Sequence, residues 1–226
     1  MRRPRSDGRV KGVLFDLDET LIDRRRSLDR YARALRGAYR GRFAEDEFVA
    51  HFHRLDGAGR VPRRQFFEGI ARELFDDATA DAIEAHFYTH AWRAPLLHDG
   101  MAAILLDVRA RGWRCGIITN GAVAAQSAKI DNSGLRASVD GALISDAFGV
   151  KKPDPTIFRG LIDALGIDPA QSWFVGDDPR ADVWGAKQVG LRACWIERYA
   201  AWPDELPRCY DARVTNAEQL RAVLFD

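Results

Sequence analysis

Cysteines and long apolar runs are scarce in this chain, and their scarcity excludes several classes of protein. The three cysteines, Cys115, Cys194 and Cys209, form an odd set without the spacing of a metal site. They therefore predict neither a disulfide framework nor a zinc module. Cys115 and Cys194 lie in apolar segments as small hydrophobes, which fits a reducing cytoplasm. No apolar run approaches the length that spans a membrane, so we expect no membrane partner.

An excess of charge of either sign is absent too. Lys and Arg total 34, Asp and Glu total 33, and the formal net charge is +1. Proteins that bind nucleic acid usually show a basic excess or a basic stripe, so we expect no nucleic-acid partner. Residues 1–9 are basic, but no apolar segment follows them before the first predicted strand. They predict a disordered tail rather than a secretory signal.

The chain does contain an alternation of strands and helices. Its 226 residues, 46% of them hydrophobic, suit one large domain or a core domain carrying a smaller one. Short apolar runs predict strands at Val13–Phe15, Cys115–Thr119, Ala142–Ser145, Trp173–Gly176 and Ala193–Ile196. Helices are predicted at Met101–Arg111, 122–133, Pro155–Leu165, Asp182–Val189 and Asn216–Leu224. Such alternation predicts βαβ units, and hence an α/β fold with a parallel sheet.

Residues 24–94 break this rhythm. They contain no convincing strand, and amphipathic patterns predict helices at Leu28–Tyr39, Glu45–Leu55, Arg63–Phe75 and Thr79–Trp92. An all-helical insert after the first strand predicts a small second domain, with residues 1–23 and 95–226 as the core. We expect it to form a cap over the end of that strand, although an extra stabilising layer is the simpler interpretation.

Two carboxylates follow the first predicted strand directly, in Asp16-Leu17-Asp18-Glu19-Thr20. Strand alternation places Asp16 and Asp18 on the same side of the backbone. In open α/β sheets, ligands bind beyond the carboxyl ends of the strands. Two acids this close repel each other unless a cation or a shared proton compensates. Taken alone, the pair is equally well an acidic turn.

Polar groups also follow two other strands. Thr119-Asn120-Gly121 joins a hydroxyl and an amide to a helix start, which can bind an anion or form an ordinary cap. The stretch from Gly176 to Asp182 carries Asp177, Asp178 and Asp182. These acids can bind a hard cation through oxygen atoms, or can cap the next helix.

Lysine is rare in this chain. Of the 34 basic residues only five are Lys, so arginine is the default surface cation. Two of the five lysines, Lys151 and Lys152, stand together before Pro-Asp-Pro. This scarcity weakens, without excluding, the interpretation that the pair lies in a solvated loop.

In order and placement these residues resemble the four motifs of the haloacid dehalogenase (HAD) superfamily, in particular its phosphatase-like members with a helical (C1-type) cap. The matched positions, motif by motif, are Asp16, Asp18 and Thr20; Thr119; Lys152; and Gly176, Asp177 and Asp182. The resemblance extends over residues 10–225 and is weak inside the helical insert. It implies a Rossmann-like parallel sheet with helices on both faces and a helical cap inserted after the first strand.

The resemblance also implies a chemistry, in which phosphate is removed from a small phosphorylated metabolite. Asp16 would attack phosphorus and form an aspartyl-phosphate, and Asp18 would serve as general acid and then as general base. Mg²⁺ would be bound by Asp16, the Asp18 carbonyl and Asp177, while the Asp18 carboxyl stays free. It would thereby offset the repulsion between a dianionic substrate and an anionic nucleophile.

The remaining matched residues would support this chemistry. Thr119, Asn120 and Lys152 would hold the phosphoryl oxygens. Asp182 would orient Lys152 or a metal-bound water. Thr20 and Asp178 would lie just behind the groups that touch metal and substrate, although helix capping explains Asp178 equally well.

Other functions stay open at this stage. A 2-haloacid dehalogenase is disfavoured because those members lack the second Asp, here Asp18, and a phosphomutase usually carries Gly where this chain has Glu19. A non-catalytic binding protein would be expected to have lost one of the motif residues. Nucleoside monophosphates and sugar phosphates are both candidate substrates. The sequence is compatible with a monomer and with a homodimer. The run Arg24-Arg25-Arg26 either meets an anionic leaving group or forms a solvated hinge.

Overall fold

The computed structural model describes residues 9–226, which form two compact units. The first contains residues 9–23 and 97–226, and the second contains residues 24–96. The tail expected over residues 1–9 lies outside the described residues except for Arg9. The Arg9 guanidinium donates to the Asp163 carboxylate (3.0 Å) and to the Ile167 carbonyl (3.3 Å), so this residue is anchored rather than frayed.

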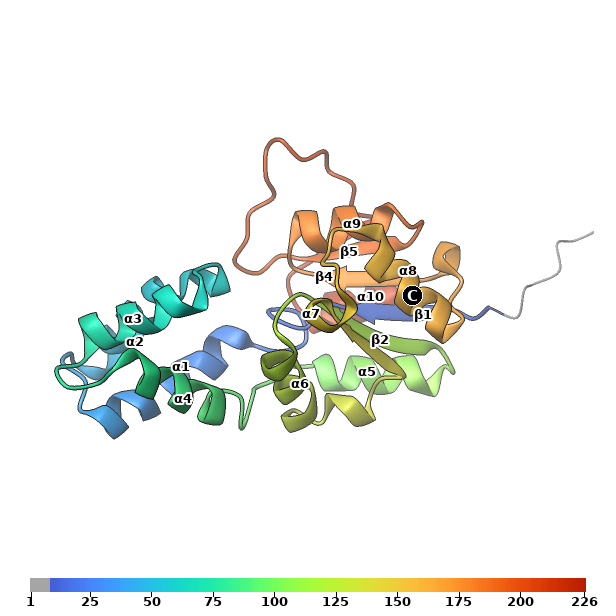
Figure 1. The fold of residues 1–226 in the computed structure, drawn as a ribbon. Coiled ribbons are helices and arrows are strands. Elements are labelled where there is room, and N and C mark those ends of the chain that lie inside the picture. The colour runs from blue at the N-terminus through green and yellow to red at the C-terminus, as the bar shows by residue number, and fades with distance from the viewer. Residues whose placement is uncertain (1–8) are drawn as a thin grey trace, which may run out of the picture. The chain divides into compact units, whose positions relative to one another are not determined.

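The first unit is built on a parallel sheet with the strand order β3-β2-β1-β4-β5-β6 (Figure 1). The strands are β1 (Gly12–Phe15), β2 (Arg114–Thr119), β3 (Gly141–Ile144), β4 (Trp173–Gly176), β5 (Arg192–Ile196) and β6 (Ala212–Val214). The predicted α/β fold with a parallel sheet is confirmed. The sequence pattern does not predict β6, because this three-residue edge strand contains no apolar run.

Helices cover both faces of this sheet, with α5 and α6 against one face and α8 and α9 against the other (Figure 1). The longer ones are α5 (Met101–Ala110), α6 (Val123–Asn132), α8 (Pro155–Leu165) and α10 (Ala217–Phe225). Strand alternation divides the core accordingly: Val13 and Phe15 pack on the side of α5, and Leu14 packs on the side of α8. A sheet buried on both faces explains why the strands are continuously apolar.

The structure differs from the expected helices at two strand ends. The strand expected to reach Ser145 ends at Ile144, and the short helix α7 (Ser145–Phe148) follows it. The helix expected over Asp182–Val189 starts earlier, as the π-helical turn η4 (Pro179–Trp184), and continues as α9 (Gly185–Lys187). The earlier start follows from Asp178, whose carboxylate caps the turn by accepting hydrogen bonds from the backbone N–H groups of Arg180 and Ala181.

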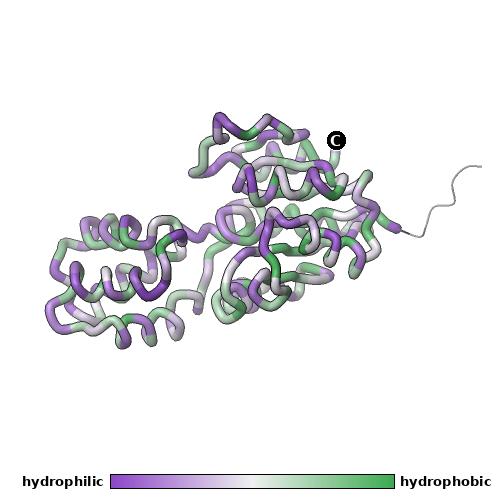
Figure 2. Tube along the Cα trace, turned by 45° about the horizontal axis from the view of Figure 1, so that its top comes forward, coloured by the Kyte–Doolittle hydropathy of each residue, from purple (hydrophilic) through white to green (hydrophobic). Residues whose placement is uncertain are grey.

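The second unit is all-helical in its described residues. Its longer helices are α1 (Arg24–Tyr39), α2 (Glu45–Asp56), α3 (Arg63–Leu74) and α4 (Ala80–His90). Hydrophilic and hydrophobic stretches alternate along their traces, as in amphipathic helices (Figure 2). Phe66 and Phe87 meet edge to face inside this unit at a centroid distance of 5.9 Å. Phe87 and Trp92 are buried, whereas Tyr88 is 47% exposed and does not belong to the core of this unit.

Arg24 shows that the arginine run is not simply a solvated hinge. Its side chain is buried in the second unit and forms an ion pair of 2.8 Å with Asp56, whose side chain is fully buried. Burial alone would raise the pKa of Asp56, but hydrogen bonds and charge from Arg24 and Arg63 lower it below its ordinary value. The pair connects the start of α1 to the end of α2.

We expect Asp56→Asn to destabilise the helical unit by about 3 kcal/mol, because it leaves the Arg24 guanidinium buried without its counter-charge. Since the pKa of Asp56 is lowered in the folded state, the carboxylate stabilises the protein above the unfolded-state pKa of about 4. This contribution is lost as the pH falls through the folded-state pKa. Urea unfolding followed by circular dichroism at several pH values checks both effects.

The matched control is Asp76→Asn, which removes an exposed carboxylate that pairs with Arg42 at 2.7 Å. It should cost less than about 1 kcal/mol, because exposed ion pairs contribute little. Equal losses in the two variants would contradict the role of the buried pair.

Candidate active site

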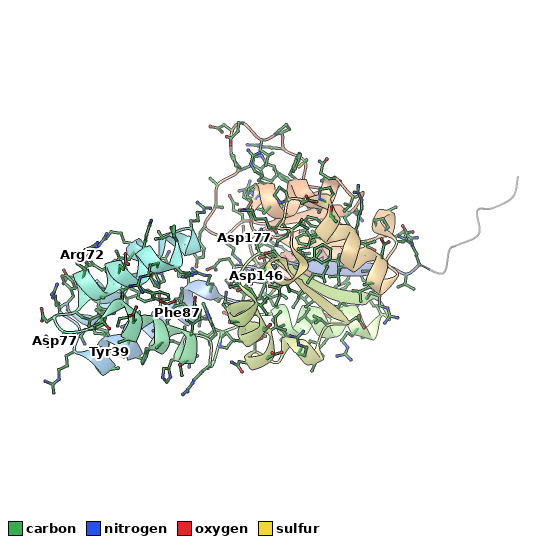
Figure 3. The ribbon with its side chains drawn as sticks, in the orientation of Figure 1. Tyr39, Arg72, Asp77, Phe87, Asp146 and Asp177 are labelled. Atoms are coloured by element: carbon green, nitrogen blue, oxygen red, sulfur yellow. The ribbon has the colours of Figure 1, made fainter. Side chains whose placement is uncertain are left out.

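The candidate site lies where three neighbouring strands end. Phe15 of β1 is level with Ile117 of β2 and with Val175 of β4. Asp16, Thr119 and Asp177 therefore follow or end adjacent strands at the same edge of the sheet. Figure 3 labels Asp177 at this edge, together with Asp146 of the neighbouring α7. The parallel register is what brings together motif residues more than 100 positions apart in the chain.

Lys152 connects the first and fourth motifs. Its ammonium group lies 2.5 Å from Asp16 Oδ1 and 2.7 Å from Asp182 Oδ1, and the side chain is buried. The Asn120 side chain holds the Lys152 backbone on both sides, accepting from its N–H (2.9 Å) and donating to its carbonyl (3.0 Å). Asn120 was expected to hold phosphate, and in the structure its amide positions the lysine.

The carboxylates around Lys152 are crowded and buried. Burial raises the pKa of Asp16 to about 7 against the opposing charge of Lys152, and Asp182 and Asp18 act in the same direction as burial. The pKa of Asp177 is raised well above its ordinary value, first by burial and then by repulsion from Asp16 and Asp182. Burial disfavours the charge of Lys152 too, but the two carboxylates raise its pKa, so it stays an ammonium ion. One ammonium ion faces three acids, which leaves the site deficient in positive charge.

These residues fit a hard cation. Oxygen atoms of Asp16, Asp177 and Asp182 lie within 4.8 Å of one another, and carboxylate oxygens are the ligands that Mg²⁺ prefers. Both Asp182 oxygens already accept hydrogen bonds, from Lys152 Nζ (2.7 Å) and from the Asp178 backbone N–H (3.0 Å). Asp16 and Asp177 are therefore the side chains best placed to bind the ion. A Cβ atom at Gly176 would collide with the Asp182 carboxyl, which explains the glycine before Asp177.

The Asp18 carboxyl, which was expected to stay free of the metal, is held by side chains of α6. Lys129 Nζ lies 2.8 Å and 2.7 Å from its two oxygens, and Gln126 Nε2 lies 3.0 Å from Oδ2. Gln126 Nε2 also donates to Thr119 Oγ1 at 2.5 Å. Helix α6 thus carries two side chains that contact the first and second motifs.

The other predicted residues take these places. Thr20 is buried, and among the described residues its Oγ1 has no hydrogen-bond partner. Asp178 caps η4 through its side chain and contacts Asp182 through its backbone N–H. Lys151 is exposed, next to the buried Lys152.

Two features of the site are not predicted from the motifs. The first is Lys129, which the scarcity of lysine could have drawn attention to just as it did for Lys152. Among the described residues, Lys129 and Lys152 are the two buried lysines. Nothing in the sequence singles out His98, which follows the helical insert. Its ring nitrogens lie 3.4 Å from a Glu19 oxygen and 3.5 Å from an Asp23 oxygen. His98 therefore bridges the two carboxylates at the point where the chain leaves and re-enters the first unit.

An Asp-x-Asp pair, a buried lysine and a further acidic pair meet at one edge of a parallel sheet. This arrangement is typical of one class of hydrolase. The chain belongs to the haloacid dehalogenase-like hydrolase family, whose model matches residues 10–190. This confirms the resemblance seen in the motifs.

Curated relatives agree with the family, and a solved structure shares the fold. The chain is 34% identical to phosphoserine phosphatase of Thermus thermophilus over 183 residues, which cover 81% of this chain and 66% of that protein. It is 31% identical to glyceraldehyde 3-phosphate phosphatase of Pyrococcus furiosus over 229 residues, covering 96% of this chain and 93% of the relative. The fold is similar to that of the magnesium-bound protein YfnB of Bacillus subtilis, with a TM-score of 0.76, 21% identity and coverage of 96% and 100% of the two chains. Among the described helices, none is both long enough and apolar enough to cross a membrane.

We expect Asp177→Asn to weaken Mg²⁺ binding at least about tenfold, because it removes a charged oxygen ligand from the acidic cluster. Isothermal titration calorimetry of the full chain with MgCl₂ measures this without any substrate. Asp146→Asn is the matched control, because Asp146 is exposed, caps α6 at Val123, and Asn caps helices equally well. Unchanged affinity in Asp177→Asn would contradict its assignment as a ligand.

Proposed function

We propose that this protein is a Mg²⁺-dependent phosphatase that acts on small phosphorylated metabolites through an aspartyl-phosphate on Asp16. The observation that carries the proposal is the placement of Lys152 Nζ 2.5 Å from the Asp16 carboxylate, beside the Asp177 carboxylate. In this arrangement the candidate nucleophile Asp16 contacts the positive charge of Lys152 and lies beside carboxylate ligands for a metal cation. The curated relatives named above are phosphatases of small phosphorylated compounds, which supports the proposal.

In the first step an Asp16 oxygen bonds to phosphorus while the bond from phosphorus to the leaving oxygen breaks. The leaving oxygen keeps the electron pair and takes a proton from the Asp18 carboxyl, which yields the free alcohol. Lys152 and the Thr119 hydroxyl would bind the phosphoryl oxygens as negative charge spreads over them.

In the second step a water molecule attacks phosphorus and gives its proton to the Asp18 carboxylate. The bond from Asp16 to phosphorus breaks, inorganic phosphate leaves, and the starting protonation states are restored. Mg²⁺, bound by Asp16, Asp177 and the Asp18 carbonyl, would supply the positive charge that offsets the repulsion between phosphate and the buried acids. Asp182 would keep Lys152 aimed at Asp16, because it accepts from the same ammonium group.

The helical unit, residues 24–96, would act as the cap that selects the substrate. The relatives' names support a phosphate ester of a small polar molecule as substrate, such as a sugar phosphate, a hydroxy-acid phosphate or a nucleoside monophosphate. Free buried thiols at Cys115 and Cys194 fit a reducing cytoplasm.

The competing activities of the same superfamily fit less well. A dehalogenase would have no use for Asp18, because a halide departs without a proton. A phosphomutase usually carries Gly in place of Glu19, and the structure shows why glycine suits this position: Glu19 has φ of 59°, which favours residues without a Cβ.

The test of the proposal is release of phosphate from p-nitrophenyl phosphate and from a panel of phosphorylated metabolites, with and without Mg²⁺. We expect turnover that depends on Mg²⁺, and a loss of kcat of about 10³-fold or more in Asp16→Asn, since the nucleophile is removed. Lys187→Met, which breaks an ion pair with Asp211 that includes no motif residue, should retain the wild-type rate. Absence of turnover on every phosphomonoester, in protein with bound Mg²⁺, would overturn the proposal.

A further inference from the structure

Each of the two acids in the Asp16–Asp18 pair has its own buried lysine. Lys152 contacts Asp16, and Lys129 contacts Asp18. The Lys129 side chain is 3% exposed, and its ammonium group donates to both Asp18 oxygens and to Gln126 Oε1 (2.7 Å). The chain has 29 arginines among its 34 basic residues, so arginine is its usual surface cation. A buried lysine at this place departs from that usage.

The contacts hold Asp18 from a rigid element. Lys129 and Gln126 are three residues apart on α6, so their side chains lie on the same face of the helix. Gln126 donates to Asp18 Oδ2 and to Thr119 Oγ1, which ties the carboxylate to the hydroxyl expected to bind phosphate. Both Asp18 oxygens therefore accept hydrogen bonds from α6, and the carboxyl group has one orientation.

We propose that Lys129, supported by Gln126, is a positioning residue that holds the Asp18 carboxyl toward the leaving-group oxygen and away from the metal ligands Asp16 and Asp177. This inference rests on the proposed phosphatase function, in which Asp18 donates the proton. A general acid must lie within about 2.6–3.2 Å of the atom it protonates, and an error of about 1 Å in placement can cost about 100-fold in rate. Without Lys129, Asp18 would be free to rotate toward the cation that its neighbours bind.

The readout that separates positioning from a general structural role is the dependence of rate on the leaving group. p-Nitrophenolate departs readily without a proton, whereas the alkoxide of glycerol 2-phosphate needs one as the bond to phosphorus breaks. The parameter kcat/KM reports the steps up to departure of this group, so it isolates the acid step from the later attack by water.

The experiment compares wild type, Lys129→Met and the matched control Lys187→Met on both substrates with Mg²⁺. Lys187 also pairs with an aspartate, Asp211 at 2.8 Å, so the control removes the same charge from a half-buried pair that includes no motif residue. In Lys129→Met we expect kcat/KM to fall about 10- to 100-fold on glycerol 2-phosphate and less than about threefold on p-nitrophenyl phosphate. Lys187→Met should stay within about twofold of wild type on both.

The crystal structure of Lys129→Met provides a second readout that needs no turnover. It should show the Asp18 carboxyl out of hydrogen-bond reach of Gln126, or in more than one rotamer. An unmoved carboxyl, an equal loss on both substrates, or a faster reaction on glycerol 2-phosphate would each overturn the inference. If wild type turns over no phosphomonoester, the proposed function fails by itself, and the position of Asp18 in the variant still decides what Lys129 holds.

Discussion

The crowding of buried acids at one edge of the sheet is the constraint on which the rest of the site depends. Asp16, Asp177 and Asp182 are close enough for their oxygens to share one ion, and burial makes their negative charge costly. Lys152 compensates part of this charge, and its own burial is tolerable because Asp16 and Asp182 both accept from it. Under the proposed function, the remaining deficit of positive charge would give the site its affinity for a divalent cation and, once that cation is bound, for a phosphate group.

The second acid of the first motif has a different environment, and the proposed function uses this difference to give two identical side chains different roles. Asp16 faces a lysine that also holds Asp182, whereas Asp18 faces Lys129 and the amide of Gln126 on α6. Two carboxylates can serve as nucleophile and as acid–base group only when their surroundings differ. The sheet edge supplies one environment and the helix supplies the other.

Much of this organisation could be predicted from the sequence, for identifiable reasons. The strands β1, β2 and β4 are buried on both faces and are therefore continuously apolar, which makes them easy to locate. The motif residues stand directly after these strands, so a prediction of the strands also places the residues. The helix boundary at Asp178 was less predictable, because it depends on a capping contact that the apolar pattern does not show. The edge strand β6 was less predictable too, because its three residues form a strand only through pairing with β5.

The sequence by itself determined which residues are the candidates for the proposed chemistry: the order of four motifs was enough to name Asp16, Asp18, Thr119, Lys152 and Asp177. Only the tertiary structure decided how these residues are held, because the hydrogen-bond partners come from distant parts of the chain. Lys129 is 111 positions from Asp18, and Asn120 reaches Lys152 across 32 positions. A long-range contact of this kind leaves no periodicity in the sequence, since it arises when parallel strands and the helices between them bring separate segments to one edge.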